Sequence, residues 1–314
     1  MQIIPGLLLS LFVCIAACAD LQAATEKRND IAANDTTKVE MANVLFRYSS
    51  DLTVLVVALR GALLPTQGHD VPNFNEPASF AIGTDAAEIR MSMAQLSTLM
   101  NGWLLRSPKA QLKNLQIRAE GHQLLIHGTL RRGLSVGFQA KGDVGLTQDN
   151  RIRITVREVH AAGLPVKGVM DALGLDVGDF VSQKGLHGLS VDKDSFLIDP
   201  QTAFPPPQIH AKIASVRVSG QAIVLSFGQG APRLAQPPAR NYIALRGGSI
   251  RYGRDQMFHA DLTMIDTTPS DPFDFYLGRY WCQMVGGTIK ARPNGALVVS
   301  VPDYARQLKS TCRP

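Results

Sequence analysis

The residues RIRITVREV, at positions 151–159, decide the fold class of this chain. Successive side chains of a β-strand point to opposite faces of the sheet, so Ile152, Ile154 and Val156 would share one face. The other face would carry the residues between them, Arg151, Arg153, Thr155 and Arg157. This period of two predicts a strand with one face against a hydrophobic core and the other in water.

The same alternation continues upstream. In GLSVGFQAKG, at positions 133–142, Leu134, Val136 and Phe138 alternate with polar residues and glycine, and LKNLQIRAEG at 112–121 has a similar pattern. We therefore expect a meander of antiparallel strands across 112–159. Arginines on the wet faces of neighbouring strands would form a basic stripe, although an ordinary solvated face is the simpler interpretation.

Other signals place the remaining elements. The apolar run at 52–64 predicts a buried strand, and Ser92 followed by Gln95 is a capping-box pattern that predicts a helix over 92–105. Pro165 is expected to open a second short helix. Further strands are expected at 209–218, 222–227, 242–252 and 257–265, and Asn294-Gly295 predicts a terminal hairpin. The expected fold is α+β, a mostly antiparallel curved β-sheet with a few short helices packed on one face.

The first residues predict export. The stretch IIPGLLLSLFVCIAAC, at 3–18, carries no charge and is short for a membrane span, which needs about 20 residues. The tetrapeptide ending in Cys18 resembles a lipobox, in which Cys18 would be lipidated. Small residues at 21–24 fit an ordinary signal peptidase instead, and an uncleaved anchor is the third interpretation. We divide the chain into a signal segment (1–24), a flexible tether (25–40), a region of meander and helices that resembles lipid-binding proteins (41–200) and a second strand-rich region with the C-terminal hairpin (201–314).

Two of the four cysteines lie outside the predicted signal segment. They are Cys282 and Cys312. A cysteine pair in an exported protein is most simply a disulfide, which would hold the C-terminal tail against the body of the protein. The chain-entropy model values a loop of about 30 residues at roughly 3–4 kcal/mol.

We find no catalytic constellation in the sequence. Gly133-Leu134-Ser135-Val136-Gly137 matches the nucleophile elbow of α/β-hydrolases, but its surroundings alternate like a continuous strand rather than turning into a helix. The seven histidines are scattered, so a metal site is unsupported, and no cofactor motif occurs. Asp271 and Asp274 could form an acid pair. The aromatic residues around them favour a buried plug instead, with a ligand or interface patch as the rival interpretation.

The middle of the chain resembles the LmeA-type phospholipid-binding proteins, which are exported bacterial proteins. The resemblance covers about 81–198 and rests on the strand leading into the helix at Ser92, the meander and the predicted helix at Leu164-Pro165 that follows it. The resemblance implies a curved sheet that wraps an apolar groove, with a helix closing one side of the groove. The region from Tyr242 onward falls outside it, and no functional residue of the family is carried over.

Two functions follow as hypotheses for a protein of the periplasm or cell envelope. The first is a non-enzymatic protein that binds or transfers phospholipid in an apolar groove. The net charge of +6 suits an anionic membrane surface, and no nucleic-acid partner is expected. The second is an envelope scaffold that binds a protein partner through the aromatic C-terminal segment. The candidate groove residues are Leu134, Val136, Phe138, Ile152, Ile154 and Val156.

Overall fold

The computed structural model of the chain describes residues 36–106, 111–132, 134–161, 164–165, 188–192, 194–229, 232, 234 and 239–307. The strands in this part are β1 (Lys38–Arg47), β2 (Thr53–Pro65), β3 (Phe80–Ser92), β4 (Leu112–Glu120), β5 (Gln123–Arg132), β6 (Leu134–Leu146), β7 (Ile152–Ala161), β8 (Leu164–Pro165), β9 (Leu189–Asp192), β10 (Ser195–Ile198), β11 (Gln208–His210), β12 (Ile213–Ser219), β13 (Ala222–Gly228), β14 (Tyr242–Tyr252), β15 (Asp255–Asp266), β16 (Phe273–Tyr276), β17 (Thr288–Ala291) and β18 (Leu297–Val301). The helical segments are η1 (Pro77–Ser79), α2 (Met93–Leu99), the π-helix η2 (Met100–Leu104), η3 (Leu277–Arg279), α5 (Tyr280–Val285) and α6 (Tyr304–Gln307).

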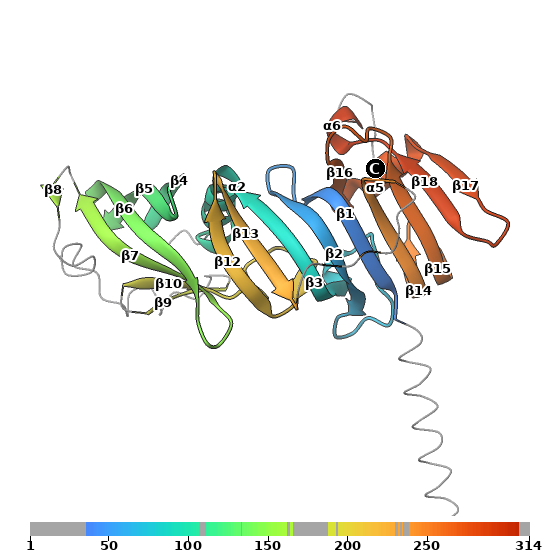
Figure 1. The fold of residues 1–314 in the computed structure, drawn as a ribbon, viewed down its shortest axis with the longest axis horizontal. Coiled ribbons are helices and arrows are strands. Elements are labelled where there is room, and N and C mark those ends of the chain that lie inside the picture. Colours follow the sequence, from blue (N-terminus) through green and yellow to red (C-terminus); the bar gives the residue numbers. More distant parts are fainter. Residues whose placement is uncertain are drawn as a thin grey trace, which may run out of the picture.

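The larger sheet joins segments from both ends of the chain. Its strands follow the order β12-β13-β3-β2-β1-β14-β15-β18-β17, with β11 paired to β3 and β16 paired to β1. Most neighbours are antiparallel, whereas β15 with β18, β1 with β16 and β3 with β11 are parallel. Figure 1 shows β17 at one end of this long sheet and β12 at the other.

The smaller sheet contains the predicted meander. Its strands follow the order β4-β5-β6-β7-β10-β9, with β8 paired to β7, and all of these pairs are antiparallel. In the chain it is inserted between β3 and β11 of the larger sheet. The predicted fold class is therefore confirmed: mostly antiparallel strands with a few short helices.

The helix that follows β3 begins where the capping pattern predicts. The Ser92 hydroxyl accepts a hydrogen bond from the Gln95 backbone N–H at 3.2 Å, which satisfies one of the free donors of the first turn of α2. Leu96 and Leu99 are buried on one side of the helix, which continues as η2 to Leu104. The helix contacts β3 and β4, so it lies between the two sheets.

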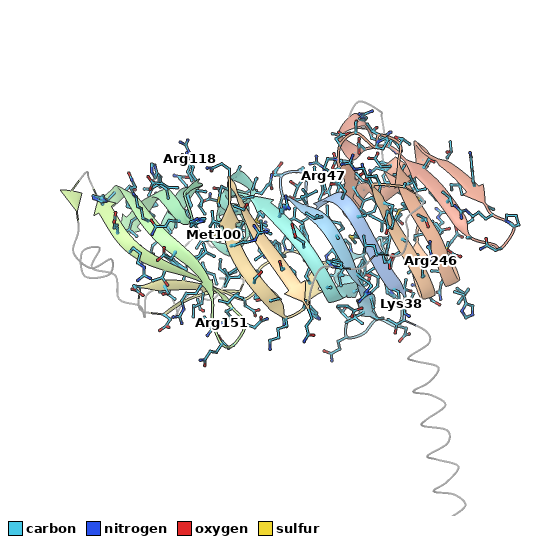
Figure 2. All side chains as sticks on the ribbon, viewed as in Figure 1. Lys38, Arg47, Met100, Arg118, Arg151 and Arg246 are labelled. Carbon is cyan, nitrogen blue, oxygen red and sulfur yellow. The ribbon has the colours of Figure 1, made fainter. Side chains whose placement is uncertain are left out.

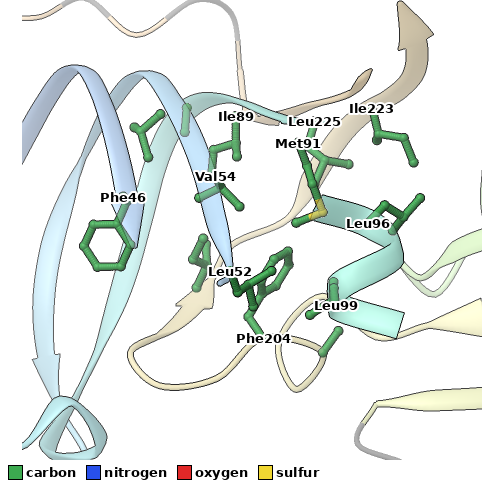
Figure 3. Packing of buried hydrophobic residues seen from close by; sticks show 14 of the residues in the cluster. Phe46, Leu52, Val54, Ile89, Met91, Leu96, Leu99, Phe204, Ile223 and Leu225 are labelled. Carbon is green, nitrogen blue, oxygen red and sulfur yellow. The ribbon is translucent and has the colours of Figure 1, made fainter. Parts of the chain in front are cut away.

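The main hydrophobic cluster of the described residues extends through both sheets. Figure 3 shows Phe46, Val54 and Ile89 from the larger sheet gathered with Leu96 and Leu99 of α2 and with Phe204. One apolar cavity of about 20 Å³ remains beneath the larger sheet, lined by residues that include Met41, Phe80 and Phe275. This volume holds about one water molecule and is too small for an acyl chain.

Two outcomes concern the second predicted helix and the terminal hairpin. Pro165 does not open a helix, because Leu164–Pro165 forms β8 and pairs with β7. A proline is compatible with a strand at the edge of a sheet, because no neighbouring strand needs the N–H that proline lacks. The hairpin between β17 and β18 is confirmed, and Gly295 at its turn has a φ of +85°.

Several predictions concern residues outside the described part of the chain. They are the signal segment and tether up to residue 35, lipidation at Cys18, the helix continuing from residue 166, and Cys312. Among the described residues no helix is long and apolar enough to cross a membrane.

Candidate functional site: the inner face of the seven-stranded sheet

The register of the smaller sheet places the candidate groove residues on one face but at opposite ends of it. Directly opposed residues of neighbouring strands share a face. Val136 lies opposite Leu130 of β5, whereas Ile154 lies opposite Val144, at the far end of β6. Along β6, positions 136 and 144 are roughly 27 Å apart. We call this common apolar surface the inner face. The side chain of Leu134 lies outside the described part.

The β7 end of the inner face is a filled core. Ile152, Ile154 and Val156 are 7, 2 and 5 % exposed. In the register of β10 and β7, Ile198 lies opposite Ile152 and Phe196 opposite Ile154, so the apolar surface continues onto β10. These three groove candidates are thus residues of the hydrophobic core.

The β6 part of the inner face is covered less completely. Val136, Phe138, Val144 and Leu146 are only half-buried, although Leu130 and Val159 on the adjoining strands are buried. We call these four residues the β6 strip. The strip therefore leaves apolar surface accessible on the face that the adjoining strands bury.

Phe138 is fixed within the strip by a glycine on the neighbouring strand. Phe138 lies opposite Gly128 in the register of β5 and β6. A Cβ atom built on Gly128 would lie 2.8 Å from Cε1 of Phe138 and 2.6 Å from Cδ2 of Leu115. The absence of a side chain at Gly128 therefore creates the space in which the phenyl ring rests, with part of the ring still accessible.

Ion pairs neutralise the predicted basic stripe on the opposite, outer face. Arg151 pairs with Asp149 at 2.6 Å, Arg157 pairs with Asp143 at 2.6 Å, and Arg153 lies 3.7 Å from Asp192. Hydrogen bonds from Gln123 and Arg157 hold the pKa of Asp143 below its usual value. The arginines that the alternation placed in water are indeed on this face, but each has an acidic neighbour.

An open cleft of about 840 Å³ lies where the two sheets meet, between α2, β4 and the turn from β12 to β13. Met93 and Ile117 contribute apolar lining, whereas the exposed Arg118 and Glu120 contribute charge. Figure 2 labels Arg118 at the top of the smaller sheet and Arg151 at its bottom in this view. The cleft runs along β4, the strand at one end of this sheet.

Side chains occupy the outer edge of β4 where another strand would otherwise pair. The Asn101 amide bonds to both backbone groups of Leu115, at 2.7 and 2.8 Å, and the Ser97 hydroxyl accepts from the Ile117 N–H at 2.9 Å. The Gln221 amide bonds to both backbone groups of Ala119. Sequence reasoning missed these residues, because no sequence pattern marks an amide that caps a strand edge.

The acidic and aromatic segment near the C-terminus belongs to the core of the larger sheet. The carboxylate of Asp274 accepts two hydrogen bonds from the Arg47 guanidinium, at 2.5 and 2.9 Å. Phe273, Phe275 and Tyr280 are at most 3 % exposed. This burial agrees with a plug and leaves these three rings unavailable to a partner.

The described residues support neither a nucleophile elbow at Ser135 nor a metal site. Ser135 lies within the continuous strand β6, opposite Arg131, so no strand-to-helix turn raises its hydroxyl. The described part of the chain contains no group of three or more metal-ligating side chains. Cys282 is 5 % exposed, and its predicted partner Cys312 lies outside the described residues.

No family model, curated protein or solved structure matches this chain.

Proposed function

We propose that this protein binds phospholipid in the cell envelope, with an acyl chain resting against the β6 strip on the inner face of the smaller sheet. The protein would act as a carrier or receptor without chemistry of its own. The signal-like first residues support a location in the periplasm or envelope.

The single observation that carries the proposal is the half-exposure of the β6 strip. Val136, Phe138, Val144 and Leu146 expose apolar surface in the middle of a sheet whose adjoining strands are buried on the same face. Covering such surface with an acyl chain removes it from water and contributes about 0.8 kcal/mol per buried methylene. The filled β7 end would close the site on one side.

The ion pairs of the outer face change what we expect of the lipid head group. Because Arg151, Arg153 and Arg157 have acidic neighbours, they contribute little net attraction to an anionic membrane. The excess charge of +6 on the whole chain still favours anionic phospholipid over neutral lipid. We therefore expect the acyl chain to provide most of the affinity and salt to weaken binding only modestly.

Lipid retention by a matched pair of variants tests the proposal. The exported chain is purified without detergent and its lipids are extracted and identified by mass spectrometry. Val136→Asp places a carboxylate in the strip and should abolish lipid retention. Ser135→Asp places the same carboxylate on the exposed outer face, one residue away, and should leave retention unchanged.

Circular dichroism of both variants establishes that the strand content is preserved. Binding to phosphatidylglycerol and phosphatidylcholine vesicles at low and high salt then separates acyl-chain recognition from charge. Absence of lipid from the wild-type chain, together with no vesicle binding at low salt, would exclude this function. Equal lipid retention by the two variants would exclude the strip as its site.

A further inference from the structure

The outermost strand of the larger sheet, β17, is fully open to solvent. All four of its residues are exposed, and Ile289 at its centre is 61 % exposed. Val285, which ends the neighbouring helix α5, is 81 % exposed. In Figure 1 β17 forms the free end of the sheet, beyond β18.

The register determines which backbone groups this edge offers. The Arg292 N–H donates to the Ala296 carbonyl at 2.8 Å at the hairpin turn. In an antiparallel pair, residues that bond across the ladder alternate with residues whose N–H and C=O point away. Lys290 therefore bonds toward β18, whereas Ile289 and Ala291 direct their N–H and C=O outward. No described residue bonds to these outward groups.

The end strands β4 and β17 differ in how their outer backbone groups are satisfied. Asn101, Ser97 and Gln221 occupy the backbone groups along the outer edge of β4. No described side chain does the same for β17. An uncovered edge strand can accept a further strand from another chain, and the short length of β17 and its Lys290 restrict which strand can pair there.

The charges beside this edge indicate what kind of strand it would accept. Lys290 and Arg292 alternate with Ile289 and Ala291, and neither forms an ion pair with a described residue. A second copy of β17 would bring these cations close to their own counterparts, and like charges across a strand pair are destabilising. Acidic residues at the facing positions would be favoured.

The apolar residues of this edge indicate that the partner strand would also carry apolar side chains. Ile289 lies opposite Val299, which is 1 % exposed, so Ile289 stands at the margin of the sheet's buried face. We propose that β17 is a docking edge for an extended segment of a partner protein in which acidic and apolar residues alternate. The acidic residues face Lys290 and Arg292, and the apolar residues cover Ile289.

A synthetic peptide of alternating valine and glutamate, blocked at both ends and labelled for fluorescence anisotropy, tests this docking. A valine–lysine peptide is its charge control. The whole chain should bind the glutamate peptide at least tenfold more tightly. In hydrogen exchange, the amides of Ile289 and Ala291 should slow when the peptide is added, while that of Lys290 should change little because it already bonds to β18.

Two substitutions at Ala291 distinguish backbone pairing of the peptide from non-specific binding. Ala291→Pro removes an outward N–H and should weaken binding at least tenfold, whereas Ala291→Val retains the N–H and should bind normally. Thermal unfolding establishes that both variants fold. The double change Lys290→Glu and Arg292→Glu should reverse the preference toward the lysine peptide.

Three results would overturn the proposal. They are no difference in affinity between the two peptides, equal binding by the two Ala291 variants, and protection of amides elsewhere in the protein but not at positions 289 and 291. Because these measurements involve no lipid, they stand or fall separately from phospholipid binding.

Discussion

Gln221 makes with Ala119 the two hydrogen bonds that a neighbouring strand would make. Its Nε2 donates to the Ala119 carbonyl at 3.0 Å, and its Oε1 accepts from the Ala119 N–H at 3.1 Å. The backbone carbonyl of Gln221 also accepts from the Met93 N–H at 2.9 Å, at the start of α2. One residue in the turn between β12 and β13 therefore joins the larger sheet to both the helix and the edge of the smaller sheet.

We expect Gln221→Ala to destabilise the protein by about 1 kcal/mol, because two exposed hydrogen bonds are lost and water replaces them only in part. Combined with Asn101→Ala, it also uncovers four backbone groups on β4. The double variant should therefore self-associate, as exposed strand edges do. Urea unfolding and analytical ultracentrifugation measure the two effects. Gln201→Ala is the control, and equal sedimentation of control and double variant would contradict the edge-capping role.

The ion pair between Arg47 and Asp274 provides a second test. Asp274 is buried, and the Arg47 guanidinium also packs against the ring of Tyr304, 5.5 Å from its centre. Arg47→Ala leaves a buried carboxylate without its partner and should lower the free energy of unfolding by about 3–5 kcal/mol. The exposed pair between Arg90 and Glu88, at 2.7 Å, is the matched control, and Arg90→Ala should cost less than about 1 kcal/mol. Similar losses of unfolding free energy in the two variants would contradict the prediction that the buried pair contributes more than the exposed one.

Local patterns were sufficient to predict the meander of β4 to β7 in the smaller sheet, but not β8, where a helix was predicted, nor β9 and β10. Alternation identified the strands of the meander because a strand with one wet face must separate apolar from polar side chains residue by residue. The capping pair of Ser92 and Gln95 and the turn at Asn294-Gly295 were equally predictable, since each acts through backbone groups a few residues away.

Strand partners distant in the chain could not be predicted. In the larger sheet β3 pairs with β13 and β1 pairs with β14, although in the chain all strands of the smaller sheet lie between the members of each pair. Backbone hydrogen bonds are the same for every sequence, so alternation does not specify which strand lies beside which. The sequence pattern also does not show how completely a face is covered. Val136 and Ile154 occur in the same kind of alternation, yet Val136 is half-buried and Ile154 belongs to the core.

The predicted disulfide between Cys282 and Cys312 is our third test. Cys282 is buried beside the C-terminal strands, so a bond there would hold the tail against the body. Peptide mapping under non-reducing conditions should find the two cysteine peptides linked, and reduction should lower stability by roughly 3–4 kcal/mol. Recovery of both cysteines as thiols from protein exported in its native envelope would rule the bond out.

The final prediction concerns pH and Asp303, a carboxyl group near the Arg47–Asp274 pair. Burial raises the pKa of Asp303 to about 6, and the nearby Asp266 and Asp271 add to the effect, whereas Arg306 opposes it. One oxygen of Asp303 accepts from the Asp274 N–H at 2.9 Å. In the unfolded chain an aspartate has a pKa of about 3.9.

Between these two pKa values the folded state holds a proton that the unfolded state has released. The stability contributed by Asp303 is therefore complete below about pH 4 and is lost as the pH rises to about 6. Asp303→Asn keeps an acceptor for the Asp274 N–H and never ionises. The variant should gain about 2–3 kcal/mol relative to wild type between pH 4 and pH 7.

Urea unfolding at several pH values measures this difference. Asp143→Asn is the control of opposite sign, because hydrogen bonds from Gln123 and Arg157 lower the pKa of Asp143. Its carboxylate stabilises the fold above its unfolded-state pKa, and that contribution is lost as the pH falls. The Asp143→Asn variant should therefore lose stability relative to wild type as the pH rises. If the stability of Asp303→Asn ran parallel to that of wild type across this range, the buried carboxyl would not be the titrating group.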